Sequence, residues 1–277
     1  MKRWGGLDVR QIGVIARKEL SDRIRNRWVL AATAIFSAFS LAIAYFGAAQ
    51  HGVVGVSDLE VTIASLVSLA VYLIPLIALI LGFDAIVGER ERGSLDLLLS
   101  MPLTRSELLL GKYIGLSAAL TCSTAIGFGM AGVLLGSSLS PNVLYHYSGF
   151  VLSAVLLGLA FLSIALMVST FAADRASASG AAIAVWFFLV LVYDLLLLGA
   201  LVASGGQIGT DAFPYLLLLN PTDVFRILNI FGREDTRAFY GLATVVSDGL
   251  THPVLLCSVM LAWILAPLAL ASWRFRK

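Results

Sequence analysis

Five long stretches of the chain contain no charged residue. They are residues 28–57, 61–83, 113–173, 176–193 and 249–273. A helix needs about 20 mostly apolar residues to cross the hydrocarbon core of a bilayer. The alternation of long apolar runs with short charged segments therefore predicts an all-α integral membrane protein and argues against a soluble globular domain.

These runs hold six candidate membrane spans. The run of residues 113–173 is too long for a single crossing, and the polar cluster at residues 137–142 divides it into two spans. Together the spans make one transmembrane domain that occupies residues 1–277. The predicted spans lie near residues 28–48, 61–83, two within 113–173, 178–203 and 254–272.

Lysine and arginine gather in one set of alternate loops. Eight lie in residues 1–27, four between the second and third spans, one after the fourth span and three at the C-terminus, which is sixteen of nineteen. Loops rich in these residues stay on the cytoplasmic side. Both termini are therefore predicted to be cytoplasmic. A cleaved signal peptide is a weaker interpretation, because both the charged head and the apolar run after it are too long.

The composition supports the same class. Hydrophobic residues make up 59% of the chain and charged residues 13%, whereas soluble domains carry about 25% charged residues. The formal net charge of +2 follows from the basic loops and gives no indication of a nucleic-acid partner. Cys122 and Cys257 lie inside predicted spans without the spacing of a metal site or a disulfide frame, so we expect them to serve packing.

Residues 9–26, before the first span, are amphipathic. Apolar residues recur at four-residue spacing, and charged residues occupy the other faces. This is the pattern of a helix that lies on the inner membrane surface, and a solvated basic arm is the alternative. The residues assigned to this interfacial helix are Ile12, Ala16, Arg17, Lys18, Glu19, Leu20 and Ile24.

The loop between the second and third spans, residues 84–112, is the most distinctive segment of the sequence. Residues 88–93 alternate in charge between two glycines, and residues 94–101 form a short apolar stretch that stops at Pro102. A charged turn followed by a short amphipathic helix suits insertion into a groove on a soluble partner. The basic residues also fix the topology, but acids add little to that effect, so topology alone does not explain Glu89, Glu91 and Asp96.

The helix that continues into the third span has a marked start and a small-residue face. Thr104 and Glu107 have the spacing of a capping box, which begins a helix. Two G-x-x-x-G patterns allow close approach of a neighbouring helix, so we expect a packing seam within the subunit or across a dimer. The paired glycines are Gly111 with Gly115 and Gly132 with Gly136.

Residues 204–253, between the fifth and sixth spans, are predicted to be extracytoplasmic. Residues 213–219 are apolar but too short to cross a membrane, which fits a re-entrant or interfacial helix. Thr222 is placed to cap a second short helix that has one apolar face. These helices would shield the mouth of a pathway or dock an extracytoplasmic partner. The docking residues would be Asn220, Pro221, Val224, Phe225, Arg226, Leu228 and Phe231.

Asp194 is the only ionisable residue well inside a predicted span. An ion in hydrocarbon costs at least about 2.5 kcal/mol, so residues of this kind are candidates for function. One hypothesis is an ion-coupled secondary carrier that uses Asp194. The alternatives are a carboxylate that is hydrogen-bonded to Tyr193 or to a neighbouring helix, and one that lies close enough to the membrane interface to stay hydrated.

Two segments on the predicted cytoplasmic side carry a recognisable pattern. They are residues 88–98 with Arg105, Gly111 and Lys112, and residues 16–20 with Asp22 and Arg25. This pattern resembles ABC-transporter permeases of the type-2 exporter class. The resemblance implies a homodimer whose coupling helix docks on a dimer of a separate ATPase. The coupling residues would be Gly88, Glu89, Arg90, Glu91, Arg92, Gly93, Ser94, Leu95, Asp96, Leu97 and Leu98.

The stretch Leu-Asn-Pro-Thr-Asp-Val-Phe-Arg at residues 219–226 and the overall length narrow the resemblance. They are similar to the family of NosY-type permeases, which serve the maturation of nitrous oxide reductase. This implies a NosF-like ATPase dimer in the cytoplasm, a NosD-like copper-handling protein in the periplasm and a place in the bacterial inner membrane. A type-2 exporter of another substrate and a membrane anchor for an extracytoplasmic assembly are the alternatives.

ATP hydrolysis is not expected of this chain. Gly111-Lys112 has Ser106 where a Walker A motif needs glycine, and Tyr113 where it needs serine or threonine. ATP and magnesium would bind to the partner ATPase, and we expect no catalytic residue and no cofactor here. The histidines of the predicted outer loops, whose spacing does not require a metal site, are His51, His146 and His252.

Overall fold

The computed structural model describes residues 8–46, 59–136, 141–205, 213–230 and 252–276. This described part of the chain contains helices and no strand. The helices are α1 Val9–Ile24, α2 Arg27–Phe46, α3 Leu59–Gly82, α4 Val87–Glu91, α5 Ser94–Ser100, α6 Arg105–Gly136, α7 Pro141–Phe171, α8 Arg175–Phe187, the π-helix η2 Phe188–Val192, α9 Tyr193–Ala203, α10 Phe213–Leu217, α11 Pro221–Ile230 and α12 Pro253–Arg276. The all-α class is confirmed.

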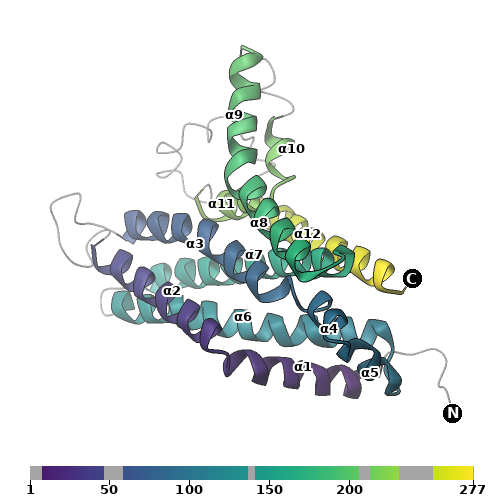
Figure 1. Cartoon of the computed structure of the whole chain (residues 1–277). Helices are drawn as coiled ribbons and strands as arrows, with labels where there is room; N and C mark the ends of the chain where they lie inside the picture. The colour runs from purple at the N-terminus through teal and green to yellow at the C-terminus, as the bar shows by residue number, and fades with distance from the viewer. Residues whose placement is uncertain (1–7, 47–58, 137–140, 206–212, 231–251, 277) are drawn as a thin grey trace.

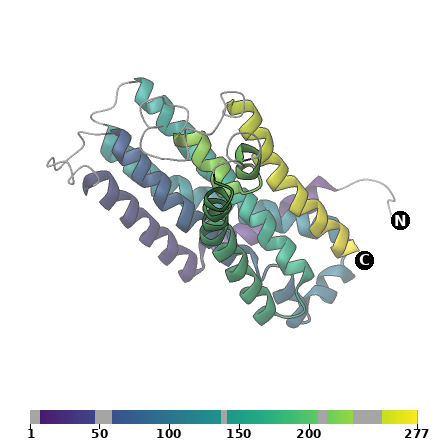
Figure 2. The ribbon, with the colours of Figure 1, turned by 90° about the horizontal axis from the view of Figure 1, so that it is seen from above.

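The long helices α6 and α7 form the centre of a bundle (Figure 1). α1 and α2 pack along α6, while α3 and α12 pack along α7. Seen from above, α2 and α12 lie on opposite sides of the bundle (Figure 2). The two halves of the chain therefore meet along the α6–α7 pair.

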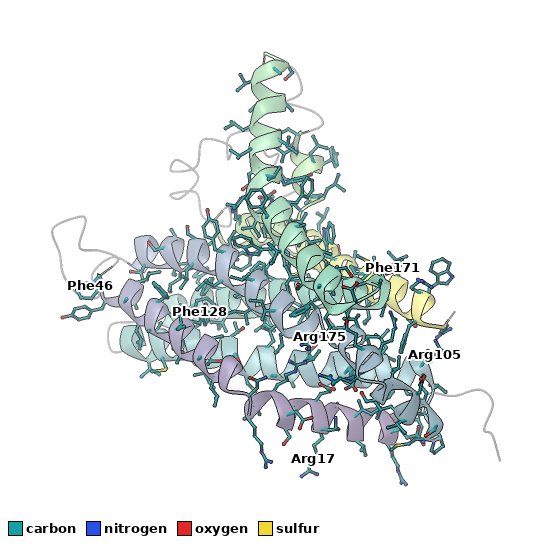
Figure 3. All side chains as sticks on the ribbon, viewed as in Figure 1. Arg17, Phe46, Arg105, Phe128, Phe171 and Arg175 are labelled. Carbon is teal, nitrogen blue, oxygen red and sulfur yellow. The ribbon has the colours of Figure 1, made fainter. Side chains whose placement is uncertain are left out.

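An aromatic cluster joins α2, α6 and α7. The ring of Phe128 on α6 packs edge-on against Phe36 of α2 and Phe150 of α7, with ring centroids 4.8 and 4.6 Å apart. All three side chains are buried, and edge-on pairs add to the stabilisation from burial. This cluster ties α2 and α7 to α6, and Phe128 is labelled in the left part of the bundle in Figure 3.

Five helical segments of the described residues are long and apolar enough to cross a membrane. They are Thr62–Glu91, Arg105–Val133, Leu144–Phe171, Arg175–Ala203 and Pro253–Arg276. They coincide with the predicted second to sixth spans. The predicted first span is also helical, in α2. Its apolar segment, Leu30–Phe46, is shorter than the five segments above. Length and composition thus support five spans, and the first predicted span stays a prediction.

The predicted capping box at the start of α6 is confirmed. The backbone N–H of Thr104 donates to Glu107 Oε2 at 2.7 Å, and the N–H of Glu107 donates to Thr104 Oγ1 at 3.2 Å. The second oxygen of Glu107 accepts from the N–H of Asp8 at 2.7 Å. Asp8 in turn caps α1 by accepting from the N–H of Arg10. One carboxylate therefore ties the starts of α1 and α6 together.

The predicted fifth span is a broken helix that stands apart from the bundle. α8 and α9 are joined by η2, and α9 projects away from the other long helices (Figure 1). The carbonyl oxygen of Leu189, in η2, accepts from Asn220 Nδ2 at 2.9 Å and from Thr222 Oγ1 at 3.3 Å. A π-helical turn shifts the usual backbone pairing, and these side chains supply partners at that point.

The start of α11 corrects one expectation. Thr222 is not the cap; instead, Asn220 Oδ1 accepts from the N–H of Thr222 at 3.1 Å, and Pro221 occupies the first helical position. Asparagine is a strong N-cap, and proline suits the first turn because its missing N–H has no helical partner there. The Asn-Pro pair therefore begins the helix, and the Thr222 hydroxyl lies 2.8 Å from Asn220 Oδ1 and 3.3 Å from the carbonyl oxygen of Leu189 in η2.

Candidate functional site: the charged loop between α3 and α6

The site begins with close packing of α1 on α6. A Cβ added at Gly111 would lie 2.6 Å from Cβ of Ile15, and one at Gly115 would lie 2.5 Å from the carbonyl oxygen of Ala16. Neither distance leaves room for a side chain, so these two glycines allow the backbones to approach. The first G-x-x-x-G pair is therefore a seam within the subunit. α1 lies along α6, where Ile15 and Glu19 are its buried residues.

Lys112 of α6 is the centre of a buried ion-pair cluster. Its side chain is 3% exposed and donates to Glu19 Oε1 on α1 and to Glu89 Oε1 on α4, the latter at 3.2 Å. Buried charges are tolerated when they are paired and hydrogen-bonded. Ser94, at the start of α5, donates to the same Glu89 carboxylate. The cluster thus connects α1, α4, α5 and α6.

Asp84, between α3 and α4, forms a second junction. Its carboxylate lies 3.5 Å from the guanidinium of Arg23 on α1 and 3.2 Å from that of Arg175 at the start of α8. Sequence analysis did not single out Asp84. The sequence shows an acid directly after a predicted span and between basic segments. Its pairing with Arg23 and Arg175 follows only from the positions of α1 and α8 in the fold.

The first helix of the loop, α4, is held against the end of α7. Ser169 Oγ accepts from the N–H groups of Ile86 and Val87 at 2.9 and 3.1 Å. Arg90 donates to the carbonyl of Ala172 at 3.0 Å, and Glu91 accepts from the N–H of Arg175 at 2.7 Å. The charged residues of this turn therefore brace the loop from within the chain.

The second helix, α5, carries the outward surface of the loop. Gly93 has φ +69°, a conformation that glycine adopts without steric cost, and it turns the chain from α4 into α5. Leu95 then points inward and is 8% exposed, whereas Leu97 is 69% and Met101 56% exposed. Asp96 is exposed beside them. We name Asp96, Leu97 and Met101 the α5 ridge.

Some of the expected coupling residues are engaged inside the chain, and others are exposed to solvent. Glu89, Gly88 and Leu95 are engaged inside the chain, because their side chains or backbone complete the packing of the loop. Leu98 is half-buried, and Leu97 is the exposed leucine.

Of the interfacial-helix residues, Arg17 and Lys18 are exposed, and Arg17 points away from the bundle (Figure 3). Ile12, Ala16 and Leu20 are half-buried along α6, and Ile24 is exposed.

A second charged cluster lies between α9 and α11. Arg226 of α11 pairs with Asp194 of α9 and with Asp223, the latter at 2.9 Å. Asn220 Nδ2 donates to the other oxygen of Asp223 at 2.9 Å. Tyr193 donates instead to the carbonyl of Leu216 at 2.7 Å. Asp194 is thus a paired carboxylate whose partner is Arg226, which supports the structural interpretation over the carrier hypothesis.

Asp223, the carboxylate of this cluster on α11, lies outside the spans. It is buried, and burial together with the nearby Asp194 carboxylate raises its pKa, while Arg226 and Asn220 oppose that shift. Two carboxylates face one guanidinium. When Asp223 is protonated, the cluster of Asp194, Asp223 and Arg226 carries no net charge.

The expectation that α11 docks an outer partner is corrected for most of its residues. Asn220, Pro221, Val224 and Phe225 are buried within the chain. Phe225 packs on Phe150 of α7 with ring centroids 6.3 Å apart, because the apolar face of this short helix turns toward the bundle. Arg226 and Leu228 are half-buried, and Phe231 lies outside the described residues.

Comparisons of the sequence with known proteins identify the family. Residues 14–277 match the family model of the ABC-2 family transporter proteins. The chain belongs to this family. It is 45% identical over 271 residues to the probable ABC transporter permease protein NosY of Pseudomonas aeruginosa. These aligned residues cover 96% of this chain and 98% of the relative. A protein of the same description from Stutzerimonas stutzeri is 44% identical over the same shares.

As an ABC-2 permease, the chain is the membrane component of an ABC transporter, and a separate ATPase is its implied partner. Its apolar helices are those of a multi-pass membrane protein. Among the described residues, no group of three His, Cys, Asp or Glu side chains is placed to hold a metal ion. His146 and His252 are exposed, and His51 lies outside the description.

Proposed function

We propose that this ABC-2 permease works as a homodimer with six spans and cytoplasmic termini in the bacterial inner membrane, driven by a NosF-like ATPase dimer that docks on the α5 ridge. The observation that carries the proposal is the contrast between Leu95 and Leu97. Leu95 is buried and anchors α5 in the chain, whereas Leu97 is 69% exposed. An exposed leucine flanked by Asp96 and Met101 suits an apolar groove with a polar rim.

The ion-pair clusters give this docking a mechanical role. Lys112 ties α4 to α1 and α6, and Asp84 ties the same loop to α1 and α8. A displacement of α5 is therefore passed to several long helices at once, since the buried pairs resist separation. The permease subunit transmits motion made by nucleotide turnover in another chain.

The proposed physiological role is copper-site maturation of nitrous oxide reductase, with a NosD-like periplasmic protein as the outer partner. It is supported by 45% identity to a probable NosY over nearly the whole length of both chains. The segment 204–253 would meet that partner. In this proposal the copper is handled by the partner, and the permease delivers ATP-driven movement to it.

The test of the coupling proposal is Leu97→Asp, compared with Val9→Asp. Both positions expose an apolar side chain, 69% at Leu97 and 78% at Val9, and both are on segments predicted to be cytoplasmic. Leu97→Asp should abolish co-purification with the ATPase from detergent-solubilised membranes, while Val9→Asp should retain it. Equal retention of the ATPase by both variants would rule out the α5 ridge as the docking surface.

The maturation role is tested separately in a strain that lacks this gene. Its nitrous oxide reductase should be deficient in copper and activity, the wild-type permease should restore both, and Leu97→Asp should restore neither. A reductase with normal copper content in the deletion strain would reject the maturation role but leave the ABC permease assignment untouched.

A further inference from the structure

A cavity of about 310 Å³ opens between α2 and α3 and is closed behind by α6. Its buried lining is mostly apolar, with Phe36, Ile74, Ile77 and Leu120 among the lining residues, and Thr33, Ser123 and Thr124 add hydroxyl groups. Ligand pockets begin at about this size and are mostly apolar with a few placed polar groups. Phe36 of the aromatic cluster and Asp84 of the charged loop are both among its lining residues.

The mouth of the cavity is basic. Arg23 from the end of α1 and Arg175 from the start of α8 both line it, and Asp84 lies between them. Two guanidinium groups thus face one carboxylate. Glu19 lies 4.0 Å from Arg23, but it is engaged by Lys112. The Arg175 side chain is also 47% exposed, so it has donors available to a ligand as well as to Asp84.

An apolar depth beneath a basic rim matches one class of ligand. We propose that this cavity binds an anionic phospholipid, with one acyl chain between α2 and α3 and the phosphate at Arg23 and Arg175. Basic pockets between membrane helices bind anionic headgroups, and guanidinium groups hold phosphate oxygens through charge-assisted hydrogen bonds. A free phosphate would use the rim alone, because it has nothing to place in the apolar depth.

The site has a consequence for the loop. Asp84 holds the two arginines at the junction of α1, the loop and α8. A bound phosphate adds negative charge at this junction and compensates the second guanidinium. The lipid therefore stabilises the arrangement that joins α1 to α8 beside the coupling loop.

The test is native mass spectrometry of the purified full-length permease, titrated with phosphatidylglycerol, with phosphatidylcholine or with inorganic phosphate. Phosphatidylglycerol should bind at least tenfold more tightly than phosphatidylcholine and should raise the melting temperature. Inorganic phosphate should neither form the complex nor reproduce the thermal shift. Equal retention of the two lipids, or stabilisation by phosphate alone, would overturn the proposal.

Two variants address the two parts of the site. Arg175→Gln removes the exposed guanidinium and should weaken phosphatidylglycerol binding about tenfold, whereas Arg17→Gln, an exposed arginine on α1 outside the cavity, should not. Ala32→Phe fills the apolar depth and should have a similar effect while every charge remains. Ala31→Phe, at an exposed neighbouring position, is its control.

If Arg175→Gln folds poorly, the comparison of Ala32→Phe with Ala31→Phe still tests the proposal. Unchanged phosphatidylglycerol affinity in a folded Ala32→Phe variant, judged by its size-exclusion profile, would refute occupancy of the cavity by an acyl chain.

Discussion

The ammonium group of Lys112 on α6 lies 3.2 Å from the Glu89 carboxylate on α4. The same ammonium pairs with Glu19 on α1. All three side chains are nearly or largely buried, so the cation serves two carboxylates that water barely reaches. The N-terminal helix α1 and the loop helix α4 therefore share one residue of α6 as an ion-pair partner.

Lys112→Met should release both α1 and α4 from α6. Removal of one partner from a buried ion pair costs about 3 kcal/mol or more, and here Glu19 and Glu89 would keep as ion pairs only their longer contacts with Arg23 and Arg92, at 4.0 and 3.9 Å. The free energy of unfolding in mixed micelles measures this loss. Lys18→Met is the control, since Lys18 pairs with Asp22 on the exposed face of α1 and such pairs contribute about 0.5 kcal/mol or less. Equal losses in the two variants would contradict the central role of Lys112.

Gly115→Leu should displace α1 from α6. The added side chain would meet the carbonyl oxygen of Ala16, a backbone atom that cannot move aside without moving the helix. Overpacking of this kind costs about 1–3 kcal/mol. Faster tryptic cleavage within α1 reports the displacement.

The matched control for this substitution is Gly129→Leu on the same helix, where a Cβ would meet nothing within 4 Å. Leucine there should leave the rate of cleavage in α1 unchanged. The seam assigned to Gly115 is wrong if both variants keep α1 protected from trypsin.

Arg226→Met should destabilise the chain more than Asp194→Asn. The first leaves Asp194 and Asp223 facing each other without a cation, whereas the second keeps the Arg226–Asp223 pair intact. We expect a difference of about 2 kcal/mol, below the full value for a buried pair because the Arg226 side chain is 26% exposed. Thermal unfolding of both variants in one detergent measures it, and the reverse order would show that Arg226 does not organise this cluster.

The stability of the wild-type protein should decrease relative to Asp223→Asn as the pH rises from about 4 to about 7. The pKa of Asp223 is raised from 3.8 by burial and by Asp194, so the folded state holds a proton that the unfolded state has released. Stability falls with pH wherever the folded state binds more protons. Melting temperatures across this range test the sign, and parallel curves for the two proteins would exclude a raised pKa at Asp223.

The predictions that succeeded from sequence concern local patterns. An apolar run of about 20 residues forms a spanning helix wherever it lies, and five such helices are found where five of the six spans were predicted. The capping box of Thr104 and Glu107 is confirmed as well, because both its hydrogen bonds join residues three positions apart.

The direction in which a side chain points was harder to predict. Leu95 and Leu97 are equivalent in hydrophobicity and only two positions apart, yet one is buried and the other exposed. The orientation of α5 decides between them, and that orientation is set by Gly93 and by the packing of α4 on α7. Composition carries no information on it.

The sequence by itself determined that this is a helical membrane protein with a charged loop between its second and third predicted spans, since hydrophobic length and local charge are properties of neighbouring residues. Only the tertiary structure decided which charges meet. Glu19 and Lys112 are 93 positions apart, and Asp84 and Arg175 are 91 apart. Their pairing requires α1 to lie along α6 and α8 to begin beside the loop, and helix packing between distant segments fixes both.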